Sequence, residues 1–146
     1  MKRIILFDTK DPERSQVRFK ANYHDAEIIF VNTVFDLFDS IEELEKKSIR
    51  PNVIVLEAEF HKDEKGMLFG NKRVRSPFAI VQFLSKKGYR FIIYTRGTSG
   101  KSFNDIVKTY ERIHVEVLNK DSETNDFRRI LDRYLLDFDK AKVTDF

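Results

Sequence analysis

The sequence predicts an α/β fold in which a doubly wound parallel sheet of five strands carries helices on both faces. Five short apolar runs recur along the chain, and near-continuous hydrophobicity over four or five residues is typical of strands buried on both faces. Segments with apolar residues at helical spacing follow these runs, and strands that alternate with helices indicate a parallel sheet. The predicted strands are Ile4–Phe7, Glu27–Val31, Val53–Leu56, Phe91–Tyr94 and Val115–Leu118.

The helical segments have recognisable starts. The first follows Asp11 and Pro12 and has a weak apolar face, whereas Val34 to Leu44 carries apolar residues spaced for one helix face. Ser76, followed by proline, and Ser102 are typical N-caps of the third and fourth helices. The strongest apolar stripe runs from Phe127 to Phe138 and predicts the last helix. The order of elements is therefore strand and helix, five times.

Composition limits the classes of protein that fit. The 146 residues are 41% hydrophobic and 35% charged, which suits one folded domain, predicted here as residues 1–140 with a tail at 141–146. The net charge of +3 is too mild to indicate a nucleic-acid partner. No apolar run approaches a membrane span or a signal peptide, and cysteine is absent, which suits a reducing cytoplasm. The segment Phe60–Arg75 shows no clear pattern and carries a charge of +3 by itself, from five basic and two acidic residues.

Chemically useful side chains follow four of the predicted strands. Asp8 ends the first run, Glu57 the third, Thr95 the fourth, and Lys120 lies just beyond the fifth. Ligands of such sheets bind beyond the carboxyl ends of the strands, so these four side chains are the candidates for a common pocket. Carboxylate oxygens are ligands for Mg²⁺, which makes Asp8 and Glu57 a weak candidate metal site.

The order of these residues resembles the receiver domain of bacterial response regulators in two-component signal transduction. The resemblance covers most of the chain and implies a flavodoxin-like sheet of order 2-1-3-4-5. Receivers carry an acidic pair after the first strand, here Asp8 with Asp11, and a phospho-accepting Asp after the third strand, where this chain has Glu57. Thr95 matches the hydroxyl residue after the fourth strand and Lys120 the lysine after the fifth. In the family the acidic pair holds a divalent cation and the acceptor carboxylate attacks a phosphoryl group.

The chain departs from the family pattern at the acceptor itself. Glu57 is one methylene longer than Asp, and in-line transfer tolerates little misplacement. Lys10 lies beside Asp8 and weakens cation binding, and Asp11 contributes only if the turn folds back. We therefore expect a pseudo-receiver in which Glu57 is a fixed carboxylate that reaches toward Lys120 and Thr95.

Two other interpretations remain open from the sequence. The stretch from Thr95 to Ser102 ends in Gly-Lys-Ser and opens a helix, so Gly97, Gly100, Lys101 and Ser102 are a candidate anion-binding loop of a nucleotide-binding protein. Residues 83–97 look like part of a haloacid-dehalogenase-like phosphatase, whose two catalytic carboxylates would correspond to Glu57 and Glu59. That interpretation leaves the first two strand–helix units unexplained.

The function expected from the resemblance is that of a signalling interaction module, not of an enzyme, with no residue assigned a catalytic role. The family uses the face built from its fourth helix, fifth strand and fifth helix for protein contacts, and we expect that this chain can form a homodimer through the same face. In this chain that face implies Tyr110, Val115, Lys120 and the segment Arg128–Tyr134.

Overall fold

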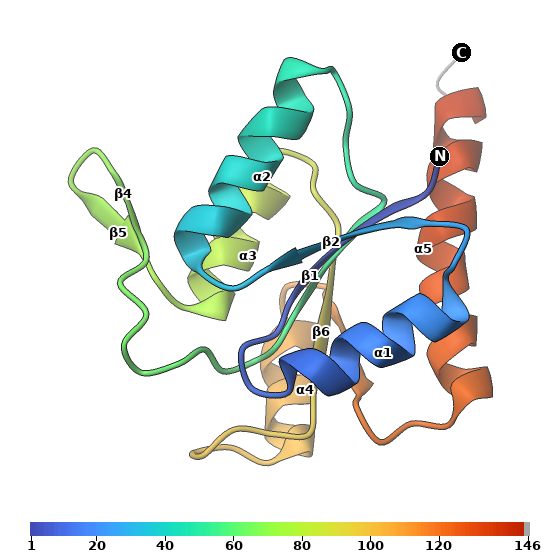
Figure 1. Ribbon diagram of the computed structural model, residues 1–146. Helices are drawn as coiled ribbons and strands as arrows, with labels where there is room; N and C mark the ends of the chain where they lie inside the picture. The colour runs from blue at the N-terminus through green and yellow to red at the C-terminus, as the bar shows by residue number, and fades with distance from the viewer. Residues whose placement is uncertain (145–146) are drawn as a thin grey trace.

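The computed structural model describes the backbone of residues 1–144 and the side chains of residues 1–136. A parallel sheet of five strands lies between two layers of helices (Figure 1). Its spatial order is β2-β1-β3-β6-β7, which is 2-1-3-4-5 when these strands alone are counted, so the predicted topology is confirmed. The strands are β1 Arg3–Phe7, β2 Glu27–Val31, β3 Val53–Leu56, β6 Phe91–Thr95 and β7 Glu116–Asn119.

Alternation along the strands divides the core into two parts. One part contains Ile5, Phe7 and Ile54, which pack against the helices α2, α3 and α4. The other contains Ile4 and Leu6, which pack against α1 and α5 on the opposite face of the sheet. Successive strand residues point to opposite faces, so both faces of β1 and β3 are buried, as the continuous apolar runs predict. The helices are α1 Pro12–Asn22, α2 Val34–Lys46, α3 Pro77–Ser85, α4 Phe103–Glu111 and α5 Thr124–Thr144.

The helix starts follow local capping chemistry. The hydroxyls of Thr33, Ser76 and Ser102 each accept a hydrogen bond from the N–H group three residues later, at the starts of α2, α3 and α4. Asp11 precedes α1 but its side chain makes no capping bond, because that carboxylate is used elsewhere. Helix α5 continues through Thr144, past the expected domain boundary at residue 140, and residues 145–146 of the predicted tail lie outside the described residues.

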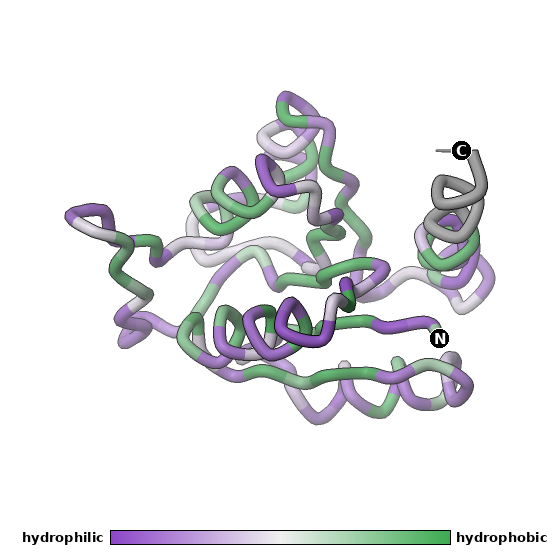
Figure 2. Tube along the Cα trace, turned by 90° about the horizontal axis from the view of Figure 1, so that it is seen from above, coloured by the Kyte–Doolittle hydropathy of each residue, from purple (hydrophilic) through white to green (hydrophobic). Residues whose placement is uncertain are grey.

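The segment 60–75, which the sequence left without a pattern, contains an antiparallel hairpin of β4 Met67–Phe69 and β5 Lys72–Val74. Gly70 in the connecting turn has a φ of 62°, a conformation that glycine adopts without steric cost. Figures 1 and 2 show the hairpin projecting from the side of the domain that carries α2 and α3. No helix of the described residues is long and apolar enough to span a membrane.

Candidate functional site

Two of the side chains expected at the strand ends, Asp8 and Glu57, meet at the ammonium group of a third, Lys120. The Lys120 Nζ lies 2.8 Å from Asp8 Oδ2 and 2.8 Å from Glu57 Oε1. It also lies 3.1 Å from Asp11 Oδ2. The side chains of Lys120, Asp8 and Glu57 are each at most 2% exposed. Carboxyl ends of neighbouring parallel strands lie at the same edge of a sheet, and this brings Lys120, Asp8 and Glu57 together in one buried cluster, with the partly exposed Asp11 at its rim.

Asp8 is held by the turn that follows β1. Its Oδ1 accepts hydrogen bonds from the backbone N–H groups of Lys10 and Asp11, at 2.9 and 3.0 Å. Its Oδ2 accepts a bond of 2.5 Å from the hydroxyl of Ser15 on α1. Burial by itself raises the pKa of Asp8, but these donors and the Lys120 ammonium outweigh it, so the pKa lies below its ordinary value. The same bonds fold the turn back and bring Asp11 into the cluster.

Asp11 joins the pocket to an arginine that the sequence interpretation missed. The guanidinium of Arg96 donates to Asp11 Oδ2 at 2.7 Å and to Asp121 Oδ1 at 2.8 Å. Burial raises the pKa of Asp11, but bonds from Lys120 and Arg96 outweigh it and lower the pKa. Arg96 directly follows the predicted Thr95, but its reach toward the β1 and β7 loops depends on the loop backbone, which gives no signal in the sequence.

Glu57 takes the place expected for the acceptor. Besides the contact of Oε1 with Lys120, its Oε2 accepts a hydrogen bond from the N–H of Ala58. The carboxylate also acts on α4: burial raises the pKa of the Tyr110 phenol, and the negative charge of Glu57 raises it further. Both oxygens of Glu57 therefore have donors within the protein.

Thr95 is fully buried, but its hydroxyl does not join the cluster. It donates to the carbonyl oxygen of Gly97 at 3.1 Å and accepts from the Gly97 N–H at 3.0 Å. The structure thus brings Glu57 to Lys120 as expected, whereas the Thr95 hydroxyl turns toward its own loop and not toward Glu57.

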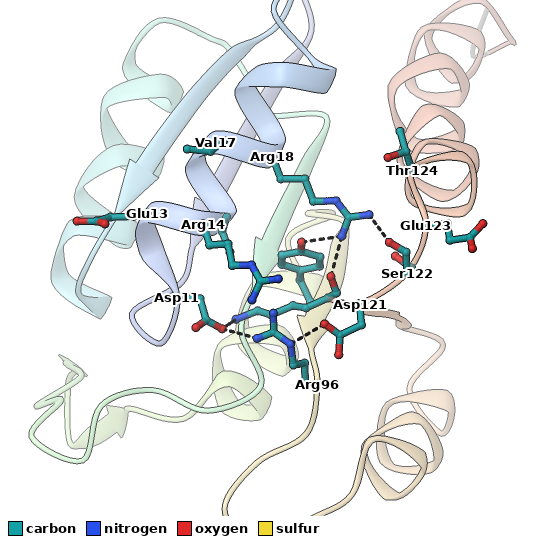
Figure 3. Close-up of a pocket in the computed structure, with 13 residues that line it drawn as sticks. Asp11, Glu13, Arg14, Val17, Arg18, Arg96, Asp121, Ser122, Glu123 and Thr124 are labelled. Carbon is teal, nitrogen blue, oxygen red and sulfur yellow. Dashed lines mark hydrogen bonds and ion pairs between the residues drawn. The ribbon is translucent and has the colours of Figure 1, made fainter.

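A second arginine missed from the sequence fixes the loop that carries Lys120. Arg18 of α1 donates to the carbonyl oxygens of Lys120 and Ser122, at 2.8 and 2.5 Å, and to the Tyr94 hydroxyl at 3.2 Å. Its guanidinium also lies 4.1 Å from the centre of the Phe127 ring. Figure 3 shows these bonds at one side of an open pocket of about 720 Å³ between α1 and the β7–α5 loop. Arg18 therefore ties the start of α5 to α1.

Comparisons with known proteins agree with this geometry. No family model matches the sequence, and no curated protein matches it. Among solved structures, a response regulator receiver domain protein from Clostridium thermocellum superposes with a TM-score of 0.67 at 15% identity, over 99% of each chain. The chain has the fold of a receiver domain. An adenylate cyclase structure from Rhodopirellula baltica gives a TM-score of 0.69 at 16% identity, over 99% of this chain and 94% of that one. The response regulator TrrA from Thermotoga maritima, solved with Mg²⁺-BeF, gives 0.60 at 14% identity, over 92% of this chain and all of that one.

The metal expected from the receiver fold can be tested against the residues present. A divalent cation needs several free oxygen ligands. Here Asp8 uses both oxygens for protein donors, Glu57 does the same, and the ammonium of Lys120 lies against both carboxylates. Among the residues that the structure describes, no three acidic or imidazole side chains form a group able to hold a metal ion. In this arrangement the charge of the two carboxylates is matched by an internal ammonium.

The candidate anion-binding loop is engaged by the protein itself. Ser99 donates both its N–H and its hydroxyl to the carboxylate of Glu59, which also accepts from the Lys10 ammonium at 3.2 Å. The Thr98 hydroxyl accepts from the N–H groups of Gly100 and Lys101, at 3.4 and 3.0 Å. An external anion would compete with Glu59 for the Ser99 donors.

The expected partner face needs a correction at two residues. Tyr110 is 4% exposed and Lys120 is 6% exposed, because both side chains turn into the core and the ion-pair cluster. They cannot form the outer contact surface. The exposed part of the same face includes instead Arg133, which donates to Glu116 of β7 at 2.6 Å.

Proposed function

We propose that this chain is a cytoplasmic signalling interaction module with a receiver fold, which acts through protein contacts and without phosphorylation at Glu57. The observation that carries the proposal is the buried ion-pair cluster, in which one ammonium group contacts Asp8 and Glu57 at 2.8 Å. The absence of cysteine fits a reducing compartment.

The chemistry of the cluster supports this proposal in two ways. A nucleophilic carboxylate must aim a lone pair at the incoming phosphorus, and the hydrogen bond accepted by each oxygen of Glu57 holds this carboxylate in an orientation set by Lys120 and Ala58. A phosphoryl group also needs positive charge to neutralise it, and here the charge of Lys120 is already matched by Asp8 and Glu57. Both features favour a fixed pocket over a reactive one.

The face formed by α4, β7 and α5 is the partner surface that we propose, and a homodimer through it is included. Ile113, Val115 and Val117 lie half-buried on or beside β7, and the exposed Arg133 of α5 bonds to Glu116 of the same strand. A half-buried aliphatic strip with a charged rim has the composition of a protein-binding patch. Lys120 directly follows β7 and joins the end of that strand to the ends of β1 and β3, so the ion-pair cluster supports the position of β7 in this surface.

The test is incubation of the protein with acetyl phosphate and Mg²⁺, followed by intact-mass measurement. We expect no added phosphoryl group on the wild-type protein, and no change in its amide NMR spectrum with beryllofluoride and Mg²⁺. A stoichiometric acyl-phosphate that disappears in the Glu57→Gln variant would overturn the proposal and restore a working receiver. Turnover of a generic phosphomonoester, lost in the same variant, would instead support the phosphatase interpretation. The Lys101→Ala variant tests the nucleotide interpretation, which requires an ATP-dependent rise in melting temperature that this substitution abolishes.

A further inference from the structure

The hairpin of β4 and β5, together with the residues leading into and out of it, forms a basic projection, here called the basic hairpin (residues 62–75). Its charged residues all lie on the surface, except for the half-buried Glu64. The hairpin stands out from the α2 and α3 side of the domain in both views (Figures 1 and 2). The basic residues are Lys62, Lys65, Lys72, Arg73 and Arg75.

The positive charge of the basic hairpin is not matched within the described part of the chain. None of its five basic side chains forms an ion pair there, and Arg73 donates only to the carbonyl oxygen of Lys65. Asp63 and Glu64, the two acidic residues of the basic hairpin, form no ion pair with its five basic side chains. Glu64 accepts from the backbone N–H groups of Val34 and Gly66, and Asp63 lies 3.5 Å from the exposed His61.

An apolar side chain lies among these charges. Strand alternation turns Met67 and Phe69 toward the domain and leaves Leu68 on the outer side, opposite Arg73 in the register. Leu68 is 55% exposed, which makes it one of the most exposed large apolar residues described. A leucine surrounded by unpaired cations is suited to a ligand that is itself acidic and partly apolar.

The basic hairpin is also held firmly, so it does not have to be ordered when a ligand binds. The Phe69 ring packs against Phe38 of α2 and Phe83 of α3, with ring centres 4.8 and 4.5 Å apart. Phe60, at the entrance to the segment, stacks on Phe7 of β1 at 4.2 Å. The bond from the Val34 N–H to Glu64 ties the same segment to the start of α2. A rigid surface avoids much of the entropy cost of binding.

We propose that the basic hairpin docks an acidic protein segment whose aliphatic side chain packs on Leu68. A protein is favoured over a nucleic acid because Phe60 and Phe69 are packed inward and leave no exposed ring on the hairpin for stacking bases. The small net charge of +3 for the whole chain also gives little general attraction to a phosphate backbone. This surface is separate from the α4–β7–α5 face and from the ion-pair cluster.

The test is fluorescence polarisation with two labelled peptides, both rich in Asp and Glu, one with a central Leu and one with Ser in its place. We expect the full-length protein to bind the Leu peptide more tightly. The Lys65→Glu/Lys72→Glu variant should weaken binding by about tenfold or more, because like charges then face each other. The matched control is Lys47→Glu/Lys86→Glu, which changes the net charge equally at exposed positions at the ends of α2 and α3. This control should change the affinity by less than about twofold.

The Leu68→Ser variant separates the apolar contact from the charge. It should bind the Leu and Ser peptides equally, while its melting temperature stays close to that of the wild type because Leu68 packs on nothing in the core. Equal weakening by the hairpin variant and the control, no peptide binding by the wild type, or tighter binding to single-stranded DNA or to phosphatidylserine vesicles would each overturn the proposal. None of these results depends on the acetyl phosphate test, so the two proposals fail independently.

Discussion

Replacement of Lys120 by methionine tests the ion-pair cluster directly. The substitution keeps the length of the side chain but removes the charge from a site where Lys120, Asp8 and Glu57 are at most 2% exposed. Asp8 would keep its bonds from two backbone N–H groups and from Ser15, whereas Glu57 Oε1 would lose the donor it has in the structure. Removal of one partner from a buried ion pair costs about 3–5 kcal/mol, and we expect the unfolding free energy to fall by that amount at pH 7.

Urea denaturation measures this loss. A small domain has a total stability of about 5–15 kcal/mol, so a destabilised but folded variant is the expected product. The midpoint should fall without a change in the slope. The Lys101→Met variant is the control, because Lys101 is exposed and outside the cluster, and it should change stability by less than about 0.5 kcal/mol.

The double variant Lys120→Met/Glu57→Gln tests whether the loss of stability in Lys120→Met comes from the unpaired Glu57 carboxylate. If the cost comes from the orphaned carboxylate, removal of the Glu57 charge should restore at least about 1 kcal/mol in a double-mutant cycle. A loss below about 1 kcal/mol for Lys120→Met, or strict additivity of the two substitutions, would refute the reasoning.

Three further outcomes follow from the same contacts. Arg18→Ala should lower the unfolding free energy, measured by urea denaturation, by about 2 kcal/mol, because charge-assisted bonds to two carbonyl groups are lost. A change below about 0.5 kcal/mol would contradict this prediction. Phe60→Ala should cost about 1–2 kcal/mol in the same assay, since a half-buried ring stacked on Phe7 is removed, and an unchanged midpoint would show that the stack contributes nothing. The pKa values of Asp8 and Asp11 are lowered in the folded protein, so their stabilisation is complete above the ordinary titration range of an aspartate and is lost as the pH falls through the folded-state values. Thermal melts from pH 6 to pH 2 that show no such decline would be inconsistent with the lowered pKa values.

The parts of the fold that depend on long apolar patterns could be predicted from the sequence. The five parallel strands agree with the predicted runs to within one residue at each end, because burial on both faces requires continuous Ile, Val, Leu and Phe. The hairpin could not be found in this way. Its strands have three residues each, and the outward-facing Leu68 and Arg73 mix apolar and charged residues in a stretch too short for a period to show.

Some residues of the candidate site could likewise be predicted from the sequence, and others could not. Asp8, Glu57 and Lys120 could be predicted to meet because parallel topology brings strand ends together whatever the details of the loops. Arg18 and Arg96 could not, because each crosses between loops that are far apart in sequence, and only the folded backbone sets that distance. The position of the Thr95 hydroxyl is likewise decided by the turn at Gly97, not by the residue type.

The bonds at the carboxyl edge of the sheet join the four loops that follow β1, β3, β6 and β7. Lys120 joins the β7 end to β1 and β3, and Arg96 joins the β6 loop to the β1 and β7 loops. Glu59 after β3 accepts from Lys10 of the β1 loop and from Ser99 of the β6 loop. Each of these loops is therefore cross-linked by charged groups of the protein itself. A bound phosphoryl group would act by drawing such loops together, and under the function proposed above the internal carboxylates supply that attraction in its place. A surface supported by these loops would then be presented continuously, which is the behaviour expected of a module that signals by binding alone.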